Sequence, residues 1–332
     1  MSDRSGDARP TLVSLVVPAL NEAPNVPALL ERLEEFTTSY IDFDFELVLV
    51  DDGSTDGTAR RLLDDAKADQ QITVVRLSRN FGSHYAISAG FRQCSGDVAV
   101  VLGADMQEPI DLLGKLLVAW QAGADVVWGV RQTRTGRPRH AEFLSRLFSF
   151  LFTRFADLQN YPAEGPSGVL VDRCVLVEVN ALEERNRNVL ALIAWLGFTQ
   201  TRVSYDQLPR ANGKSRWTRT KMVKLAVDSF LQFSSMPLRA CSATGLLVSG
   251  AGLLYALVLV ARAAFGVHTP SGWATLLVVV LVLGGVQLTV FGVMGEYLWR
   301  AVEEVRRRPL YVVRDVKRSG ASTHPQERQR PR

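Results

Sequence analysis

A stretch near the C-terminal end of the chain is almost free of charge. Among the 55 residues 241–295, only Arg262 is charged, whereas the chain average of 22% would place about twelve charged residues there. Two uncharged runs, residues 240–261 and 271–295, each exceed the ~20 residues that cross a bilayer as a helix. The sequence therefore predicts two C-terminal transmembrane helices, and a buried hairpin of soluble helices is the alternative.

Basic segments flank this uncharged stretch. Residues 300–332 hold ten Lys or Arg against four Asp or Glu, residues 201–239 hold eight against two, and the connection 263–273 holds no Lys or Arg. By the positive-inside rule, both termini are cytoplasmic, and we expect an integral protein of the cytoplasmic (inner) membrane. The first ten residues contain no apolar run, so no cleaved signal peptide is predicted.

The first 130 residues alternate apolar runs with amphipathic stretches. The runs that predict strands are residues 12–17, 45–50, 72–77, 98–102 and 125–130. Helical spacing of apolar residues occupies 25–38, 58–68, 83–94 and 110–121. Nearly all-apolar strands that alternate with helices predict an α/β domain with a Rossmann-like, mostly parallel sheet covered on both faces.

Polar clusters follow four of the predicted strands. They are Asn21-Glu22, Asp51-Asp52, Ser78-Arg79-Asn80 and Asp105-Met106-Gln107. Ligands of parallel α/β sheets bind beyond the carboxyl ends of the strands, so this edge is the predicted functional site. Neither GxGxxG nor GxxxxGK[ST] is present, which disfavours a dinucleotide site and a P-loop.

Two later segments combine aromatic and basic residues at helical spacing. Residues 140–158 interleave phenylalanines with arginines, and residues 217–238 place two lysines opposite an apolar side. Both predict amphipathic interfacial helices that lie on the membrane, with ordinary core helices as the alternative. The three cysteines are scattered and offer neither a disulfide framework nor metal spacing.

The motifs, taken in order, resemble those of family 2 glycosyltransferases. They read VVPALNE (16–22), VDDGSTDGT (50–58), SRNFG (78–82), GADMQEP (103–109) and GKSRW (213–217). The segments GGVQ (284–287), GEY (295–297) and RPLY (308–311) resemble the polyprenyl-phosphate subgroup, which includes dolichol-phosphate mannose synthases and bacterial enzymes that make undecaprenyl-phosphate glucose. The resemblance covers about residues 12–313.

This resemblance implies a GT-A-type fold and a metal-dependent, inverting transfer of a sugar from a nucleotide sugar to a polyprenyl phosphate at the cytoplasmic face. A UDP-sugar is favoured over a GDP-sugar, and the sugar itself is left open. The residues matched to nucleotide binding are Pro18, Ala19, Asn21, Glu22, Asp51, Asp52 and Arg79. Their carboxylate and amide oxygens suit ribose hydroxyls and base N–H groups, although turn formation and helix capping are the simpler roles.

The resemblance also assigns a metal and an acceptor site. Asp105, which is also a catalytic candidate, and Gln107 would bind Mg²⁺ or Mn²⁺, with Glu108 as a further candidate, whereas helix capping is the alternative for Asp105. An anionic lipid phosphate needs cations and donors. The candidates are Arg131, which is also a catalytic candidate, with Arg210, Lys214, Ser215 and Arg216. A solvated basic loop near anionic lipid is the alternative, and the acidic first 200 residues disfavour nucleic acid.

The chain departs from the family pattern at two usually acidic positions, which hold Gly103 and Ser167. A lost base is tolerable because a phosphate acceptor is already anionic. The competing interpretations are a processive polysaccharide synthase and a catalytically impaired membrane partner protein. A homo-oligomer, with the glycine-rich second uncharged run as an interface, is left open.

Together these patterns divide the chain into five parts. We expect a disordered tail (1–10), a cytoplasmic GT-A domain (11–215), a juxtamembrane amphipathic helix (216–239), two transmembrane helices (240–298) and a basic cytoplasmic tail (299–332).

Overall fold

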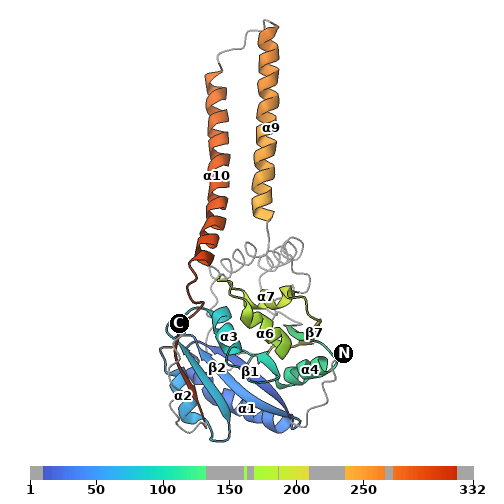
Figure 1. Ribbon diagram of the computed structural model, residues 1–332, viewed down its shortest axis with the longest axis vertical. Helices are drawn as coiled ribbons and strands as arrows, with labels where there is room; N and C mark the ends of the chain where they lie inside the picture. The colour runs from blue at the N-terminus through green and yellow to red at the C-terminus, as the bar shows by residue number, and fades with distance from the viewer. Residues whose placement is uncertain are drawn as a thin grey trace. The chain divides into compact units, whose positions relative to one another are not determined.

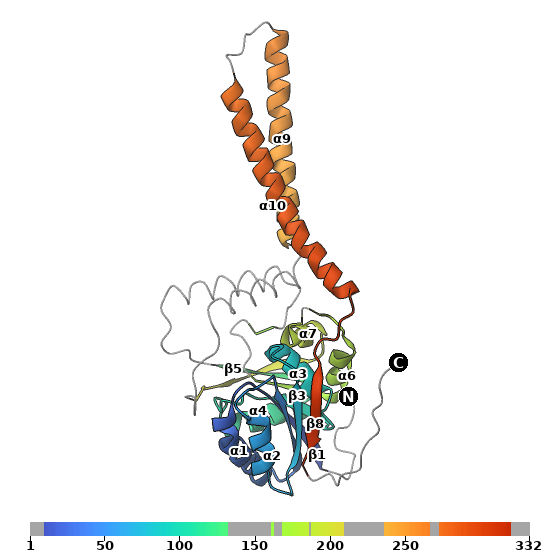
Figure 2. The same ribbon diagram turned by 90° about the vertical axis from the view of Figure 1, so that its left-hand side faces the viewer.

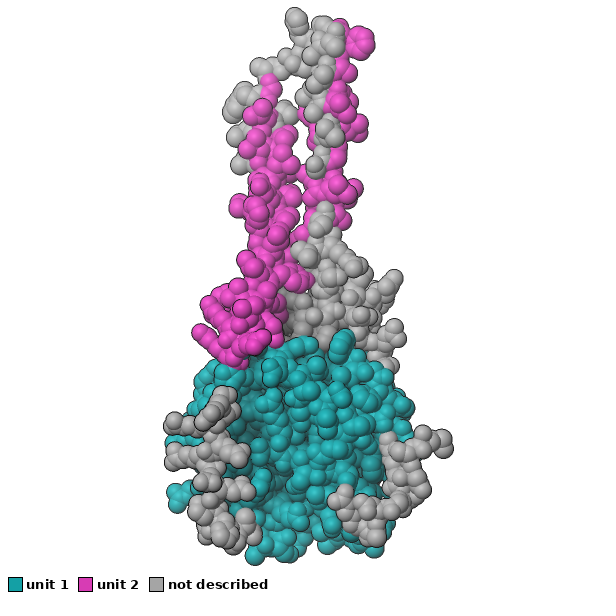
Figure 3. Space-filling model, in the orientation of Figure 1, with its two compact units in different colours: residues 1–154, 158–222, 309–332 teal, residues 155–157, 223–308 magenta. Residues whose placement is uncertain are grey.

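The computed structural model describes residues 10–131, 161–162, 168–185, 187–208, 236–265 and 272–319 (Figure 1). The chain divides into two compact units (Figure 3). One contains residues 1–154, 158–222 and 309–332, and the other contains residues 155–157 and 223–308.

The first unit is built around an eight-stranded sheet with the order β7-β5-β6-β4-β1-β2-β3-β8. The strands are β1 (Thr11–Ala19), β2 (Phe43–Asp51), β3 (Gln71–Leu77), β4 (Val98–Val101), β5 (Val126–Arg131), β6 (Gly168–Asp172), β7 (Gln200–Tyr205) and β8 (Val313–Arg318). Strands β4, β1, β2 and β3 are parallel neighbours, as are β5 and β7. The predicted α/β class and its parallel centre are therefore confirmed.

The sheet is mixed, because strands β6 and β8 run against the others. Strand β6 lies antiparallel between β4 and β5, and β8 lies antiparallel to β3 at the edge. An apolar run does not encode its own direction, because direction depends on the path of the connection that precedes it. The prediction therefore identified the central strands correctly but did not include the antiparallel strands β6 and β8.

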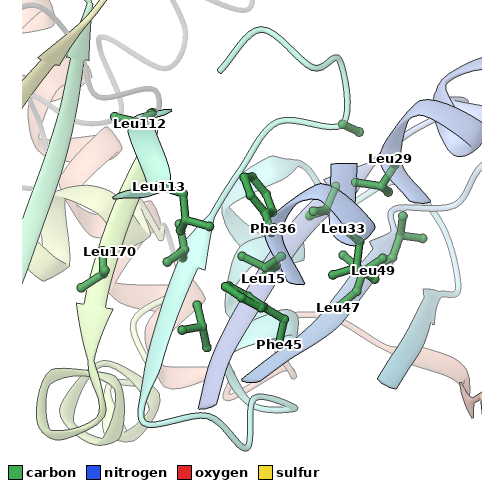
Figure 4. Packing of buried hydrophobic residues seen from close by; sticks show 14 of the residues in the cluster. Leu15, Leu29, Leu33, Phe36, Phe45, Leu47, Leu49, Leu112, Leu113 and Leu170 are labelled. Carbon is green, nitrogen blue, oxygen red and sulfur yellow. The ribbon is translucent and has the colours of Figure 1, made fainter. Parts of the chain in front are cut away.

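Within the described residues, seven short helices connect the strands. They are η1 (Ala23–Asn25), α1 (Val26–Ser39), α2 (Thr58–Asp65), α3 (Ser83–Phe91), α4 (Ile110–Gln121), α6 (Arg173–Ala181) and α7 (Val189–Trp195). Helix α1 buries Leu29, Leu33 and Phe36, the spacing that predicted it, against Leu15 and Leu47 of the sheet (Figure 4).

The other face of the sheet is covered as well. Successive strand residues point to opposite faces, so Val16 and Val50 face away from α1 and toward α3. Gly90 of α3 lies so close that an added Cβ would be 2.5 Å from the Val16 side chain. Helices α1, α2 and α4 thus share one hydrophobic core, and α3 packs on the opposite face, as a buried parallel sheet requires.

The segment predicted to be a basic tail returns to the sheet. Residues 313–318 form β8 beside β3 (Figure 2). Its ends are fixed by the hydrogen bonds that Ser78 N donates to Val312 O and Ser319 N donates to Ile72 O, both 2.9 Å long. The strand was not predicted because it is an exposed edge strand in which charged residues alternate irregularly with valines.

The second unit contains two long helices, α9 (Met236–Ala264) and α10 (Trp273–Val305), which contact each other. They coincide with the two uncharged runs. Over the described residues, no helix is both long enough and apolar enough to cross a membrane, so the predicted transmembrane helices are not confirmed. The predicted interfacial helices, 140–158 and 217–238, lie outside the described residues apart from the first turn of α9.

Partly buried His84 in α3 predicts a pH-dependent loss of stability. Its Nδ1 is buried and has no hydrogen-bond partner among the described residues, and burial lowers the pKa of His84 to about 4. The stability that the neutral ring supports is present above the unfolded pKa of ~6.5 and is lost as pH falls toward 4. At pH 5 the loss should be about 2 kcal/mol.

Urea unfolding of the full chain at pH 7 and pH 5 measures this loss. The His84→Gln variant should lose about 2 kcal/mol less than the wild type between the two pH values. An equal loss in both proteins would show that His84 is not the titrating group.

Candidate active site

The predicted polar clusters meet at one edge of the sheet. Strands β1 and β2 end side by side, with Pro18 opposite Val50 and Ala19 opposite Asp51. The loop after β4 is brought to the same edge because Leu102 N donates to Val16 O at 3.0 Å. The edge predicted from the strand order is thus formed in the structure.

The loops after β1 and β2 form one hydrogen-bonded platform. Asn21 Oδ1 accepts from Thr55 N at 2.7 Å, and Asn21 adopts a positive φ of 52°. Glu22 N donates to Thr58 Oγ1 at 2.9 Å, and the Glu22 carboxylate accepts from Asn25 Nδ2 at 2.6 Å. The side chains of Asn21 and Glu22 therefore hold the loops in place, and their predicted contact with the nucleotide stays a prediction.

The two adjacent aspartates of this platform have different environments. Both are buried, but the Asp52 carboxylate accepts from Phe81 N at 2.7 Å and Gly82 N at 2.9 Å. Burial raises the pKa of Asp52 although these two amides lower it. Asp51 instead accepts from Ser54 N through Oδ1 at 2.7 Å. Asp52 thus anchors the loop after β3 with both of its oxygens, whereas within the described residues no hydrogen bond reaches Asp51 Oδ2.

A close backbone approach joins the β2 and β3 loops. Gly53 has a φ of 77°, and an added Cβ would lie 2.6 Å from Arg79 C and 2.7 Å from Asn80 N. Arg79 itself is exposed, with its guanidinium 4.0 Å from the centre of the Phe81 ring. Only glycine fits at position 53, and Arg79 is positioned at the rim of the platform.

The loop after β4 gathers two carboxylates around Gly103. An added Cβ at Gly103 would lie 2.8 Å from Asp105 Oδ1 and 3.2 Å from Glu108 Oε2, and Gly103 N donates to Glu108 Oε2 at 3.2 Å. Burial, together with the charge of Asp105, raises the pKa of Glu108 to about 7, and nearby Arg131 opposes that rise. Asp105, Glu108 and Arg131 therefore form one electrostatic cluster.

Arg131 and Gln107 both contact the segment that follows β7. Arg131 Nη1 donates to Gln207 Oε1 at 3.2 Å, while its Nε is buried without a hydrogen-bond partner among the described residues. Gln107 O accepts from Leu208 N at 2.9 Å, and Gln107 Nε2 donates to Leu208 O at 3.4 Å. The segment continues into Arg210, Lys214, Ser215 and Arg216, which lie outside the described residues, as does Ser167.

Arg32 supports this cluster and had not been predicted. Its Nη1 donates to Glu108 O at 2.7 Å, from α1 across 76 residues of sequence. Arg32, Gly103 and Glu108 also line a small pocket whose other walls are mainly apolar side chains of the sheet and α1. No motif marks Arg32, because its partner is a backbone carbonyl that any residue could supply.

Comparison with known proteins identifies the family of the chain. Residues 14–185 match the family described as glycosyl transferase family 2. An uncharacterized glycosyltransferase of Synechocystis sp. is 38% identical over 305 residues, which cover 92% of this chain and 95% of that protein. The chain belongs to glycosyltransferase family 2. The family inferred from the motifs is thereby confirmed.

A further relative and a solved structure are also similar to this chain. A bactoprenol glucosyl transferase derived from the SfII prophage of Shigella flexneri is 33% identical, over 91% of this chain and 97% of that protein. Among solved structures, a mannosyltransferase of Pyrobaculum calidifontis in complex with GDP-Man and Mn²⁺ is 17% identical with a TM-score of 0.44, covering 86% of this chain and 88% of that one. A TM-score below 0.5 is too low to support an inference about the function of this glycosyltransferase.

The loop after β4, the acidic loop that carries Asp105 and Glu108, fits a hard divalent cation. Among the described residues, no group of three or more His, Cys, Asp and Glu side chains could hold a metal by itself. Asp105 and Glu108 nevertheless place two carboxylates beside the same glycine, and burial, together with the charge of Asp105, raises the pKa of Glu108. Mg²⁺ and Mn²⁺ accept such a partial protein set, because waters and substrate phosphates complete it.

Proposed function

We propose that the chain is a membrane-bound, inverting glycosyltransferase that moves a sugar from a nucleotide sugar, with a UDP-sugar favoured, to polyprenyl (undecaprenyl) phosphate. The product would serve as a lipid-linked sugar donor for cell-envelope glycan modification. The observation that carries the proposal is the meeting of the Asp51 platform and the Asp105–Glu108–Arg131 cluster at one sheet edge. The acceptor is supported by the similarity to bactoprenol glucosyl transferases over most of the chain.

The platform after β1 and β2 would bind the nucleoside. Asp51 offers carboxylate oxygen to base N–H or ribose hydroxyl groups, beside the backbone of Pro18 and Ala19. Exposed Arg79 at the rim would meet the donor phosphates.

The acidic loop would hold the metal and the departing group. Asp105 and Glu108, with the neighbouring Gln107, would bind Mg²⁺ or Mn²⁺, which when bound neutralises charge on the diphosphate. Arg131, buried beside these carboxylates, adds a fixed positive charge at the same place.

The reaction itself needs little acid–base chemistry. An oxygen of the lipid phosphate forms a bond to the anomeric carbon while the bond from that carbon to the nucleoside diphosphate breaks, which inverts the configuration. The attacking phosphate is already anionic, so the absence of a carboxylate at Ser167 is tolerable. Arg131, Arg210, Lys214, Ser215 and Arg216 would hold the phosphate, and the protein acts mainly by positioning and electrostatics.

A membrane location follows from the acceptor and is supported by the chain. The uncharged runs fall in α9 and α10, where large apolar side chains such as Leu247, Leu254 and Phe291 are exposed. Exposed apolar surface of this kind suits lipid rather than water. With the basic flanks on the cytoplasmic side, as the positive-inside rule favours, both termini would be cytoplasmic.

A transfer assay with a panel of donors tests the proposal. The full-length protein in detergent is incubated with undecaprenyl phosphate, Mn²⁺ and one radiolabelled UDP-sugar or GDP-sugar at a time. We expect label in the lipid phase with one donor class. Absence of lipid-phase label with every donor, in protein that is folded, would refute the proposed function.

Removal of divalent cations should stop the reaction. With excess EDTA, lipid-phase label is expected to fall by at least about a hundredfold, because the charge on the leaving diphosphate is no longer neutralised. Added MnCl₂ or MgCl₂ should restore it, whereas NaCl of equal ionic strength should not. Full activity in EDTA would exclude metal dependence.

A further inference from the structure

Three charged side chains lie in a row across strands β2, β3 and β8 at one edge of the sheet. Asp51 at the end of β2 is in register with Arg76 of β3, and Arg76 is in register with Asp315 of β8. Residues that are directly opposite on neighbouring strands point to the same face of a sheet. The row therefore alternates acid, base and acid on one face, beside the platform proposed for the nucleotide.

Arg76 is shared between the two carboxylates. Its Nε lies 3.6 Å from Asp51 Oδ2, and its Nη1 lies 3.3 Å from Asp315 Oδ2. The Asp51 side chain is 4% exposed, while those of Arg76 and Asp315 are 33% and 32% exposed. A buried carboxylate requires a positive partner, and Arg76 provides it for Asp51.

The contact between Arg76 and Asp51 is an ion pair without a hydrogen bond. The buried Nε of Arg76 has no hydrogen-bond partner among the described residues, and within them the Asp51 carboxylate accepts only from Ser54 N, through Oδ1. Arg76 thus balances the charge of Asp51 from 3.6 Å without hydrogen-bonding Oδ2. The oxygen keeps its capacity to accept a hydrogen bond from a ligand.

Strand β8 holds Asp315 firmly in this position. Besides its backbone pairing with β3, Ser319 Oγ donates to Gln70 O at 2.6 Å. The other charged residues of β8, Arg314, Lys317 and Arg318, are all basic and exposed. The single acid of the strand therefore occupies the position that faces Arg76.

We infer that Asp315 is a positioning residue for the donor site, which acts through Arg76 to keep Asp51 Oδ2 available to the nucleotide. Asp315 draws the guanidinium toward β8. Without that carboxylate, Arg76 would move onto Asp51 and hydrogen-bond the oxygen that the ligand needs. The affinity for the nucleotide would then depend on β8, which is far in sequence from the motifs matched to nucleotide binding. This inference rests on the proposed function, because it takes Asp51 to contact the nucleotide.

Titration of the full-length protein with UDP in MnCl₂, by calorimetry, tests the inference. Asp315→Asn should weaken UDP binding by about fivefold, the size expected for a coupled pair of side chains. Asp315→Glu, which keeps the charge, should restore most of the affinity. The matched control is Lys317→Gln, which removes an exposed charge opposite Val74 on the same strand and should leave UDP binding unchanged.

Kinetics separate positioning from a merely structural role. A positioning role raises the KM for the donor sugar and leaves kcat near the wild-type value, whereas partial unfolding lowers kcat and the unfolding temperature without changing the KM. If Asp315→Asn does not fold, Arg76→Lys provides the same test. Lysine keeps the positive charge but lacks the planar guanidinium that contacts both carboxylates, so weaker UDP binding is again expected.

The outcomes also separate this inference from the proposed function. If the wild type binds neither UDP nor GDP, both fail. If the wild type binds UDP and Asp51→Asn weakens binding while Asp315→Asn or Arg76→Lys does not, the inference alone is overturned.

Discussion

Replacing Asp105 with Asn should lower the rate of sugar transfer by about a thousandfold while leaving the fold intact. Asp105 is half-buried in the loop after β4, outside the hydrophobic core, and its carboxylate lies beside Gly103 and near Glu108. Asparagine keeps the shape of the side chain and removes its charge. The loss therefore falls on the binding of the metal and the diphosphate rather than on packing.

The measurement is the initial rate of lipid-phase label for equal amounts of folded protein. Asp111→Asn is the matched control, because Asp111 is an acid at the start of the following helix, where it forms a surface ion pair with Lys115 at 2.7 Å. Surface pairs of this kind contribute ~1 kcal/mol or less, so the control should keep its activity. A rate for Asp105→Asn within threefold of the wild type would remove Asp105 from the catalytic site.

Replacing Gly53 with Ala should destabilise the protein by about 3 kcal/mol and weaken donor binding with it. The new Cβ would meet the backbone of Arg79 and Asn80 at 2.6 and 2.7 Å, and a backbone cannot rotate away as a side chain can. Relief requires the loop after β3 to move, which would also displace Arg79 from the rim of the nucleotide platform.

Gly57→Ala separates crowding from backbone strain. Gly57 also has a positive φ, 83°, but an added Cβ there would meet nothing within 4 Å. This control should cost only about 1 kcal/mol, the strain of a left-handed alanine, and should leave the KM for the donor unchanged. Equal losses of unfolding temperature in the two variants would contradict the close approach of the two loops.

Much of the central sheet and its functional edge could be predicted because the signals are local. The apolar runs that became β1, β2 and β3 are long and lie next to motif residues, and the spacing of Leu29, Leu33 and Phe36 fixes the buried side of α1. Once the strands are parallel, their carboxyl ends must share an edge. Asp51 and Asp105 therefore fall at one edge without any knowledge of side-chain contacts.

The parts that could not be predicted depend on contacts between distant segments. Asp51 and Asp52 are adjacent aspartates that no sequence pattern distinguishes. Only the path of the loop after β3 brings two backbone amides to the Asp52 carboxylate. The pairing of Arg76 with Asp315 spans 239 residues and requires β8, whose exposed position leaves no clear alternation. Glu108 is distinguished by its burial beside Asp105, a property that no residue pattern encodes.

We expect this glycosyltransferase to attach a single sugar to a lipid phosphate. Mass spectrometry of the lipid formed from undecaprenyl phosphate and the active donor measures this directly. One new lipid should form, with the mass of undecaprenyl phosphate plus one sugar residue, and its rate of formation should be far lower with Asp105→Asn. A lipid heavier by an additional phosphate, a polymer of sugars without a lipid product, or no product with any donor would contradict it.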